Sequence, residues 1–204
     1  MSQTSLTDSD RFLEGKSSIE RGFALILSGL HEAYGLNLLD ENLTDTPSRV
    51  ARSYLEMLKG IDPALADDVL QQSFPSDYDG MVVISDIQCY SMCPHHFLPV
   101  KYTANFGYIP SGLVLGISKI PRFIKLMCQA PVLQETLTEN IVDKFTKIVK
   151  PLGCIITLKG YHMCMGCRGI EMPDASTITS SIRGNFESLT VREEFFNLIN
   201  SQKC

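Results

Sequence analysis

The chain has 204 residues, of which 44% are hydrophobic and 20% charged, and its formal net charge is −5. This length and composition are typical of one globular domain that buries roughly 70% of its unfolded surface, so disulfides are not needed to fold it. The acidic balance argues against a general affinity for nucleic acid or for a membrane surface. Any anionic ligand must therefore meet a local basic cluster.

The N-terminal residues 1–16 are polar and carry no apolar stretch of the signal-peptide type, so we expect a flexible arm there. No run of about 18 apolar residues occurs that could span a bilayer. The seven cysteines are odd in number, and the chain is too large for a disulfide mini-scaffold. These features favour reduced thiols in a cytoplasmic protein.

Three helices are predicted before the first strand. From Ser17 onward, apolar residues recur at helical spacing, and Gly35 marks the end of that helix. A second helix is predicted over residues 43–58, where Thr46 can cap the helix and Pro47 can take its first position. A short third helix is predicted over residues 61–72.

After residue 80 the pattern becomes rich in β-branched residues. Strands are predicted over residues 81–92, 101–108, 113–118, from 154 onward, and 177–186. Helices are predicted over residues 119–129, from about 131 to 149, and over 190–199. The order of paired strands and paired helices favours an α+β fold, with an antiparallel sheet backed by helices on one face. Because no repeat or linker interrupts the pattern, we expect a single domain over residues 17–204.

Cysteine and histidine gather in two clusters near the ends of predicted strands. The first holds Cys93, His95 and His96, and the second holds His162, Cys164, Cys167 and Arg168. If the strands are neighbours in one sheet, the two clusters converge. Zinc prefers these ligands, binding through three of them in catalytic sites and through four in closed structural sites. The spacing leaves both possibilities open, as well as the simpler interpretation that several cysteines are buried apolar residues.

The segment CPHHFLPV at 93–100 resembles the Cys-Glu-His-His-x-x-Pro segment of the GTP cyclohydrolase I family. Further segments resemble that family in the same order: DTPSRVA at 45–51, GYIP at 107–110, GISKIPRFI at 116–124, VLQETLTENI at 132–141, HMCMGCRGI at 162–170 and STITSSIRGNF at 176–186. The resemblance runs from about Ser17 to Ile199. Such an ordered set of motifs is far more specific than any one of them.

The resemblance implies the tunnelling fold and a zinc-dependent reaction that converts GTP and water to 7,8-dihydroneopterin triphosphate and formate, the first step of pterin and tetrahydrofolate biosynthesis. It also implies a homo-oligomer, a toroidal decamer with active sites at subunit interfaces. Two alternatives stay open. One is a tunnelling-fold relative that acts on another purine or pterin. The other is a non-catalytic, zinc-containing nucleotide-binding protein.

The resemblance also implies residue roles. Cys93, His96 and Cys164 would hold zinc and leave one position for water, His95 and His162 would transfer protons, and Ser118 would assist ribose opening. Glu135, supported by Gln134, would bind guanine, and Lys119, Arg122, Arg168 and Arg49 would bind the triphosphate. Taken without the family, Glu135 reads as compensation of a helix dipole and Lys119 with Arg122 as a solvated basic face. His95 reads as a histidine of the sheet that points away from His96.

The sequence departs from the family pattern at two positions. Pro94 stands where most relatives carry Glu, so a carboxylate beside the proposed metal is missing. Cys167 stands where relatives more often carry Met. It could fill the open metal position and block catalysis, although we expect it to pack beside the site as an apolar residue.

Overall fold

The structure, a computed structural model, describes residues 8–201 in two compact units that divide between Met57 and Leu58. The first unit contains α1 (Asp8–Tyr34), the short 3-10 helix η1 (Glu41–Leu43) and α2 (Thr46–Met57). Among residues 8–201, no helix combines the length and apolar character needed to cross a bilayer.

The first helix begins at Asp8, and not at Ser17 as predicted. Ser17 and Ser18 lie inside this helix, and their hydroxyls accept hydrogen bonds from the Arg21 guanidinium at 2.9 and 3.1 Å. Their hydroxyls therefore bond along the helix and do not end it. Residues 1–7 of the predicted arm lie outside the described residues.

The second unit holds the sheets and their helices. Its elements are η2 (Lys59–Ile61), α3 (Pro63–Val69), β1 (Ser73–Pro75), β2 (Val82–Met92), β3 (Pro99–Ile109), β4 (Leu113–Leu115), α4 (Lys119–Cys128), α5 (Gln134–Val149), β5 (Gly153–His162), α6 (Met163–Gly166), β6 (Thr177–Gly184), η3 (Asn185–Glu187) and α7 (Leu189–Asn200). The predicted elements are all present. The strand β1 and the single-turn helix α6 were missed because each is too short to show a period.

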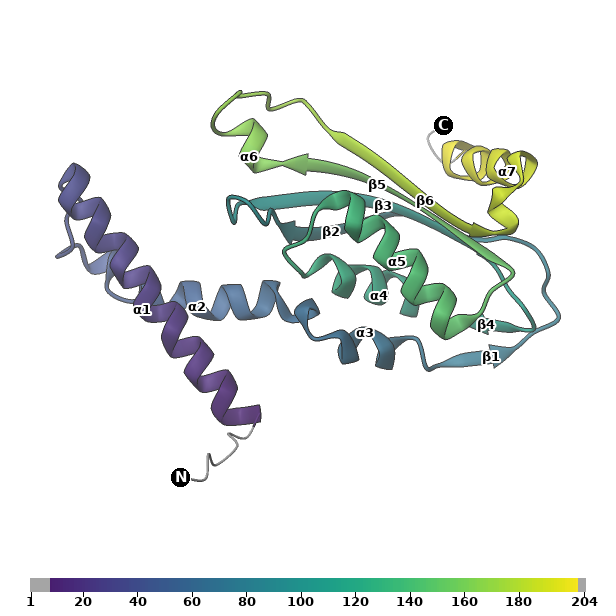
Figure 1. Cartoon of the computed structure of the whole chain (residues 1–204), viewed down its shortest axis with the longest axis horizontal. Helices are drawn as coiled ribbons and strands as arrows, with labels where there is room; N and C mark the ends of the chain where they lie inside the picture. The colour runs from purple at the N-terminus through teal and green to yellow at the C-terminus, as the bar shows by residue number, and fades with distance from the viewer. Residues whose placement is uncertain (1–7, 202–204) are drawn as a thin grey trace. The chain divides into compact units, whose positions relative to one another are not determined.

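Four strands form an antiparallel sheet in the order β2-β3-β5-β6, and β1 pairs with β4 in a separate two-stranded sheet. One face of the larger sheet packs on α4 and α5, in a core where the Phe145 ring lies 4.7 Å from that of Phe106 and 5.4 Å from that of Tyr108. The predicted α+β class, with helices backing an antiparallel sheet, is confirmed (Figure 1).

The C-terminal helix α7 covers part of the opposite face, as Figure 1 shows. Side chains alternate between the faces of a strand, so Ile155 points away from α5 and packs with Phe186 and Phe195. Gly107 permits this contact, because a Cβ at that position would lie 2.8 Å from the Phe195 ring. We call this end of the sheet, where β3 reaches Ile109, the aromatic end.

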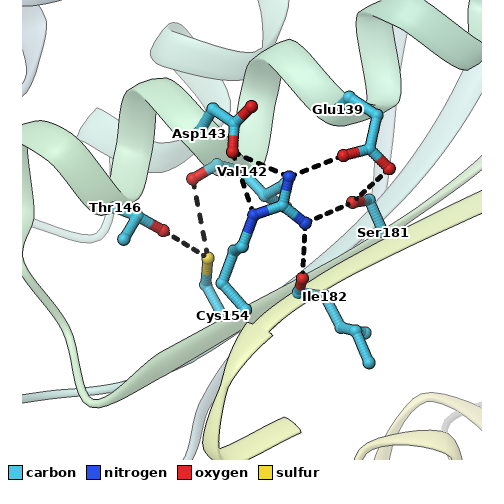
Figure 2. Close-up of polar contacts among 8 residues, drawn as sticks. Glu139, Val142, Asp143, Thr146, Cys154, Ser181 and Ile182 are labelled. Carbon is cyan, nitrogen blue, oxygen red and sulfur yellow. Dashed lines mark hydrogen bonds and ion pairs between the residues drawn. The ribbon is translucent and has the colours of Figure 1, made fainter. Parts of the chain in front are cut away.

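Arg183 of β6 ties this edge strand to α5, and Figure 2 labels its partners Glu139, Asp143, Ser181 and Ile182. Its guanidinium donates to Asp143 Oδ1 at 2.9 Å and to Glu139 Oε2 at 2.6 Å. It also donates to the Ser181 hydroxyl and the Ile182 carbonyl. The hydrogen bond from Arg183 lowers the pKa of the Glu139 carboxyl. Both carboxylates are more than half exposed, so solvent screens the pairing and keeps its contribution small.

Candidate metal centre and active site

The two Cys/His clusters meet at the other end of the sheet. Met92 pairs with Pro99 across the β2–β3 hairpin, and Val100 pairs with His162 of β5. This register brings the hairpin connection next to α6, which follows β5 directly (Figure 1). The predicted convergence of the clusters is therefore present in the structure, and we call this end of the sheet the cysteine end.

The β2–β3 connection is a tight turn. The Cys93 N–H donates to the Leu98 carbonyl and the Phe97 N–H donates to the Cys93 carbonyl, each at 2.9 Å. Phe97 takes a positive φ of 53° to close the turn. Pro94 is the first residue of the turn after Cys93, where its fixed φ and missing N–H are tolerated.

The alternative that His95 is a histidine of the sheet does not hold, because both adjacent histidines lie in this turn. The turn separates them without the alternation of a strand. Their ring centroids are 6.3 Å apart and their planes cross at 73°. His96 turns toward Cys93, whereas His95 lines the neighbouring cavity.

The ligand atoms of Cys93, His96 and Cys164 all lie within 4.8 Å of one another, and the Cys93 Sγ to His96 Nδ1 distance is 3.9 Å. Zinc bonds of about 2.3 Å to sulfur and about 2.0 Å to nitrogen would separate tetrahedral ligands by about 3.5 Å. Closing this small difference needs only side-chain movement. The geometry and the soft, mixed donor set therefore fit a metal ion such as zinc.

Arg168 places a positive charge next to two of the three donors, Cys164 and His96. Burial and the neighbouring Cys93 thiol raise the pKa of the Cys164 thiol, and the positive charge of Arg168 partly opposes that rise. The Arg168 guanidinium lies 2.8 Å from His96 Nε2. A guanidinium only donates, so His96 Nε2 accepts this bond and the hydrogen of the neutral ring lies on Nδ1, which faces Cys93. Binding of a metal through Nδ1 would move that hydrogen to Nε2 and would require the Arg168 guanidinium to turn away.

Cys167 stays apart from the cluster. Within residues 8–201, the group of close metal-binding donors contains only the three residues above. Cys167 is exposed and follows α6, where its N–H bonds to the Met163 carbonyl at 2.9 Å. The expectation that it packs beside the site as an apolar residue was wrong, because the turn after α6 carries it to the surface.

A cavity of about 160 Å³ opens beside the three donors. Its walls come from the hairpin connection, β3, the start of α5 and the end of β5. The cavity is lined by these residues with polar or reactive side chains: Cys93, His95, Tyr102, Gln134, Glu135, His162 and Cys164. The structure thus places both histidines predicted to transfer protons, and the carboxylate predicted to bind guanine, around the same cavity.

Gln134 and Glu135 occupy the first turn of α5 but differ in surroundings. Glu135 is exposed at the cavity wall, whereas Gln134 is only 3% exposed. Gln134 was expected to support Glu135, yet its Oε1 lies 2.9 Å from His162 Nε2. Burial lowers the pKa of His162, and the nearby Glu135 charge opposes that shift.

Three predicted residues, Ser118, Lys119 and Arg122, lie away from the cavity. They are at the start of α4, where the Lys119 N–H bonds to Gly116. The Leu115 N–H just before them bonds to the Tyr108 hydroxyl at the aromatic end. The far end of α4 reaches the cysteine end, because the Ser91 hydroxyl donates to Ala130.

The length of α4 therefore separates Lys119 from the cysteine end, a distance of about 15 Å. One copy of the chain does not bring these basic residues to the cavity. Arg49 belongs to the first unit, where it pairs with Asp45 at 3.4 Å.

Two residues around the cavity were missed in the sequence. Tyr102 is buried on β3, and its ring meets that of His162 edge-on, with 6.1 Å between centroids. Gly160 of β5 lies beneath Gln134 and His162. The alternation of Val100, Tyr102 and Ala104 along one strand was a usable signal for Tyr102. A lone glycine in a strand offered only a hint of close approach.

Comparison with known proteins identifies relatives along almost the whole chain. The family model for GTP cyclohydrolase I matches residues 23–200. A protein of Pelotomaculum thermopropionicum named GTP cyclohydrolase 1 is 40% identical over 188 residues, which cover 90% of this chain and 96% of the relative.

Two eukaryotic proteins of the same name are each 38% identical. The Saccharomyces cerevisiae protein matches over 91% of this chain and 76% of its own length. The Drosophila melanogaster protein matches over 89% of this chain and 55% of its own length, so the chain spans about half of that longer relative. The match extends from the N-terminal helices through the Cys/His cluster to α7, and the chain belongs to the GTP cyclohydrolase I family.

Proposed function

We propose that this protein is a zinc-dependent GTP cyclohydrolase I, which converts GTP and water to 7,8-dihydroneopterin triphosphate and formate. The observation that carries the proposal is the convergence of Cys93, His96 and Cys164 beside a cavity that is also lined by two histidines and a carboxylate. Family membership supplies the substrate, and the cavity supplies groups suited to hydrolysis of a purine ring.

Cys93, His96 and Cys164 would hold the zinc ion. When bound by three protein ligands, zinc acts as a Lewis acid that makes water nucleophilic near neutral pH. The buried position of Cys93 shields this site from bulk solvent on one side. Pro94 supplies no carboxylate here, so the proposal requires that the three donors suffice without one.

The proton-transfer roles go to His95 and His162, which line the same cavity. His95 would protonate the imidazole ring of guanine, which makes C8 more electrophilic, and His162 would move protons during ring and ribose opening. Histidine suits both roles because its ordinary pKa lies near working pH. Glu135 would accept hydrogen bonds from guanine N1–H and the 2-amino group, which match the two oxygens of a carboxylate.

The triphosphate would be bound by Lys119, Arg122, Arg168 and Arg49, with Ser118 assisting ribose opening. Arg168 contacts the proposed metal ligand His96 directly, whereas Lys119 and Arg122 lie at the end of α4 that is remote from the cysteine end. A cavity of about 160 Å³ is also small beside the roughly 300–1,000 Å³ of ordinary ligand pockets. Both features support a homo-oligomer, and we propose a decamer in which a second copy completes each site.

The remaining parts of the proposal are the single catalytic domain over residues 17–204 and a cytoplasmic location. Six cysteines within residues 8–201 are unpaired thiols, which suits a reducing compartment.

The decisive experiment is to incubate the zinc-loaded protein with GTP and to identify the products by mass. We expect dihydroneopterin triphosphate and formate from the wild type, and loss of both products in a His95→Ala variant that retains zinc. His31→Ala provides a matched control, because His31 belongs to the first unit. Unchanged GTP with tightly bound zinc would reject catalysis and favour the nucleotide-binding alternative.

A further inference from the structure

We propose that Gln134 is a positioning residue that holds the His162 imidazole in a single tautomer, with hydrogen on Nε2 and the lone pair on Nδ1. The inference deepens the proposed function and rests on it, because it assigns the direction in which His162 first transfers a proton. It concerns residues around the cavity and requires no second copy of the chain.

The first step is the orientation of the Gln134 amide. Its Nε2 lies 3.0 Å from the Leu158 carbonyl oxygen and 3.1 Å from the Thr177 carbonyl oxygen. It also lies 3.1 Å from the Thr179 hydroxyl. Carbonyl oxygens cannot donate, so a flipped amide would place oxygen against two oxygens. The network therefore fixes the nitrogen toward the strands β5 and β6 and the oxygen toward His162.

The second step follows from the oxygen. Gln134 Oε1 lies 2.9 Å from His162 Nε2, and an amide oxygen can only accept a hydrogen bond. His162 Nε2 must therefore carry the hydrogen. In a neutral imidazole only one nitrogen is protonated, so Nδ1 keeps its lone pair. In its neutral form, His162 therefore has its proton-accepting lone pair at Nδ1.

The third step is the space that permits the contact. A Cβ on Gly160 would overlap Gln134 Oε1 and would lie 2.7 Å from the Tyr102 ring and 3.1 Å from His162 Nε2. Only glycine leaves room for the amide and the imidazole to meet on this strand. The buried Tyr102 ring meets His162 edge-on and limits rotation of the imidazole.

A purely structural role is the competing interpretation. The Gln134 amide also links α5 to β6 through Thr177 and Thr179, and within α5 the Thr138 hydroxyl donates to the backbone carbonyl of Gln134 at 2.6 Å. A residue that served only this link would affect stability without setting the tautomer of His162. The two roles separate because Gln134 donates through nitrogen to the strands and accepts through oxygen from His162.

The test uses the zinc-loaded full-length protein labelled with ¹⁵N-histidine, studied by solid-state NMR, with His162 assigned by comparison with His162→Asn. We expect a protonated Nε2 and an unprotonated Nδ1 in the wild type. Gln134→Met removes both functions of the amide at similar volume. We expect a mixture of tautomers in this variant, a kcat lower by about 10- to 100-fold as for loss of one proton-transfer group, and a KM within about threefold.

Gln134→Glu separates the two roles. Its carboxylate still accepts from His162 Nε2, but it places oxygen against the Leu158 and Thr177 carbonyls. We expect this variant to keep the wild-type tautomer and to lose thermal stability. Gln88→Met is the matched control for the substitution, because Gln88 is an exposed glutamine on β2. We expect it to change neither the His162 signals nor kcat.

Three outcomes would overturn the inference. They are hydrogen on Nδ1 in the wild type, an unchanged tautomer in Gln134→Met, or a kcat in both Gln134 variants that simply follows their stability. The wild-type spectrum decides the first point even if a variant fails to fold. If the wild type forms no product from GTP while its tautomer is as expected, the proposed function fails and the positioning of His162 stands.

Discussion

The two ends of the four-stranded sheet are built from the same strands but from different chemistry. At the aromatic end, Phe186 and Phe195 are fully buried and pack on Ile155. At the cysteine end, a buried Cys93 and a half-buried Cys164 meet an exposed His96. The reactive side chains therefore lie at the cysteine end, whereas the aromatic end is held by contacts between large apolar side chains.

The difference teaches which substitutions should affect activity and which should affect folding. Side chains at the cysteine end should change metal content and rate, whereas buried side chains at the aromatic end should change the free energy of unfolding. Lys119 is the exception, because it lies at the aromatic end and is proposed to bind substrate. Four predictions, in order of decreasing effect, test this division.

The largest effect is expected from Cys164→Ala, which removes one of three metal donors. We expect the zinc content to fall well below one per chain and kcat/KM to fall by at least about 1,000-fold, because water would lose its activation. Metal analysis and the product assay measure both quantities. Cys167→Ala is the matched control, since Cys167 lies outside the cluster. Equal losses in both variants would show that the cluster is not the reactive site.

The next largest effect is expected at the aromatic end. Phe195→Ala empties a fully buried position and should lower the free energy of unfolding by about 3–5 kcal/mol. Denaturant unfolding measures this change, and the zinc content of the folded fraction should stay at the wild-type value. Phe196→Ala is the control, because that ring is 40% exposed and should cost much less. A loss of zinc without a loss of stability would contradict the division.

A smaller effect is expected from Lys119→Ala. Removal of one charge-assisted hydrogen bond to phosphate costs about 2 kcal/mol, which corresponds to a rise of about 30-fold in the KM for GTP. Zinc content and thermal stability should not change. Lys125→Ala is the control on the same helix, since Lys125 is exposed in the last turn of α4. An unchanged KM in Lys119→Ala would remove this residue from the proposed phosphate contacts.

The smallest effect is expected from Arg183→Met, which removes the ion pairs between β6 and α5. Because both carboxylates are exposed, the cost should not exceed about 1 kcal/mol. The pKa of Glu139 is lowered by Arg183, so its contribution is complete above the ordinary glutamate pKa of about 4.3 and is lost as pH falls through the lowered value. Denaturant unfolding of both proteins at several pH values should show the difference shrinking in acid. Lys159→Met, an exposed site on β5, should show no such dependence.

Much of the fold could be predicted from the sequence because its signals are local. The apolar stripe of α5 and the β-branched run of β2 can each be recognised from the residues of that segment alone. The start of α1 could not be predicted from Ser17, because a mid-helix serine and a capping serine look alike until the Arg21 contact is known. The exposure of Cys167 could not be predicted either, because it depends on the turn that follows α6.

The site could be predicted only in part. The Cys93 and Cys164 clusters were visible as residue types, but their convergence was expected only if their strands were neighbours in one sheet. The Gln134–His162 hydrogen bond could not be foreseen, because it joins the start of α5 to the end of β5 across a missing Cβ at Gly160. Such contacts depend on the register of the sheet and not on any local period.

The position of Lys119 at the opposite end of α4 from the cysteine end has a genetic consequence. If a second copy completes each site as proposed, an allele that lacks Cys164 and an allele that lacks Lys119 damage different halves of the same interface. Random co-assembly of equal amounts would then rebuild about one quarter of the interfaces with both halves intact, because each interface draws one half from each neighbour. Two damaged genes would together yield more cyclohydrolase activity than either yields alone.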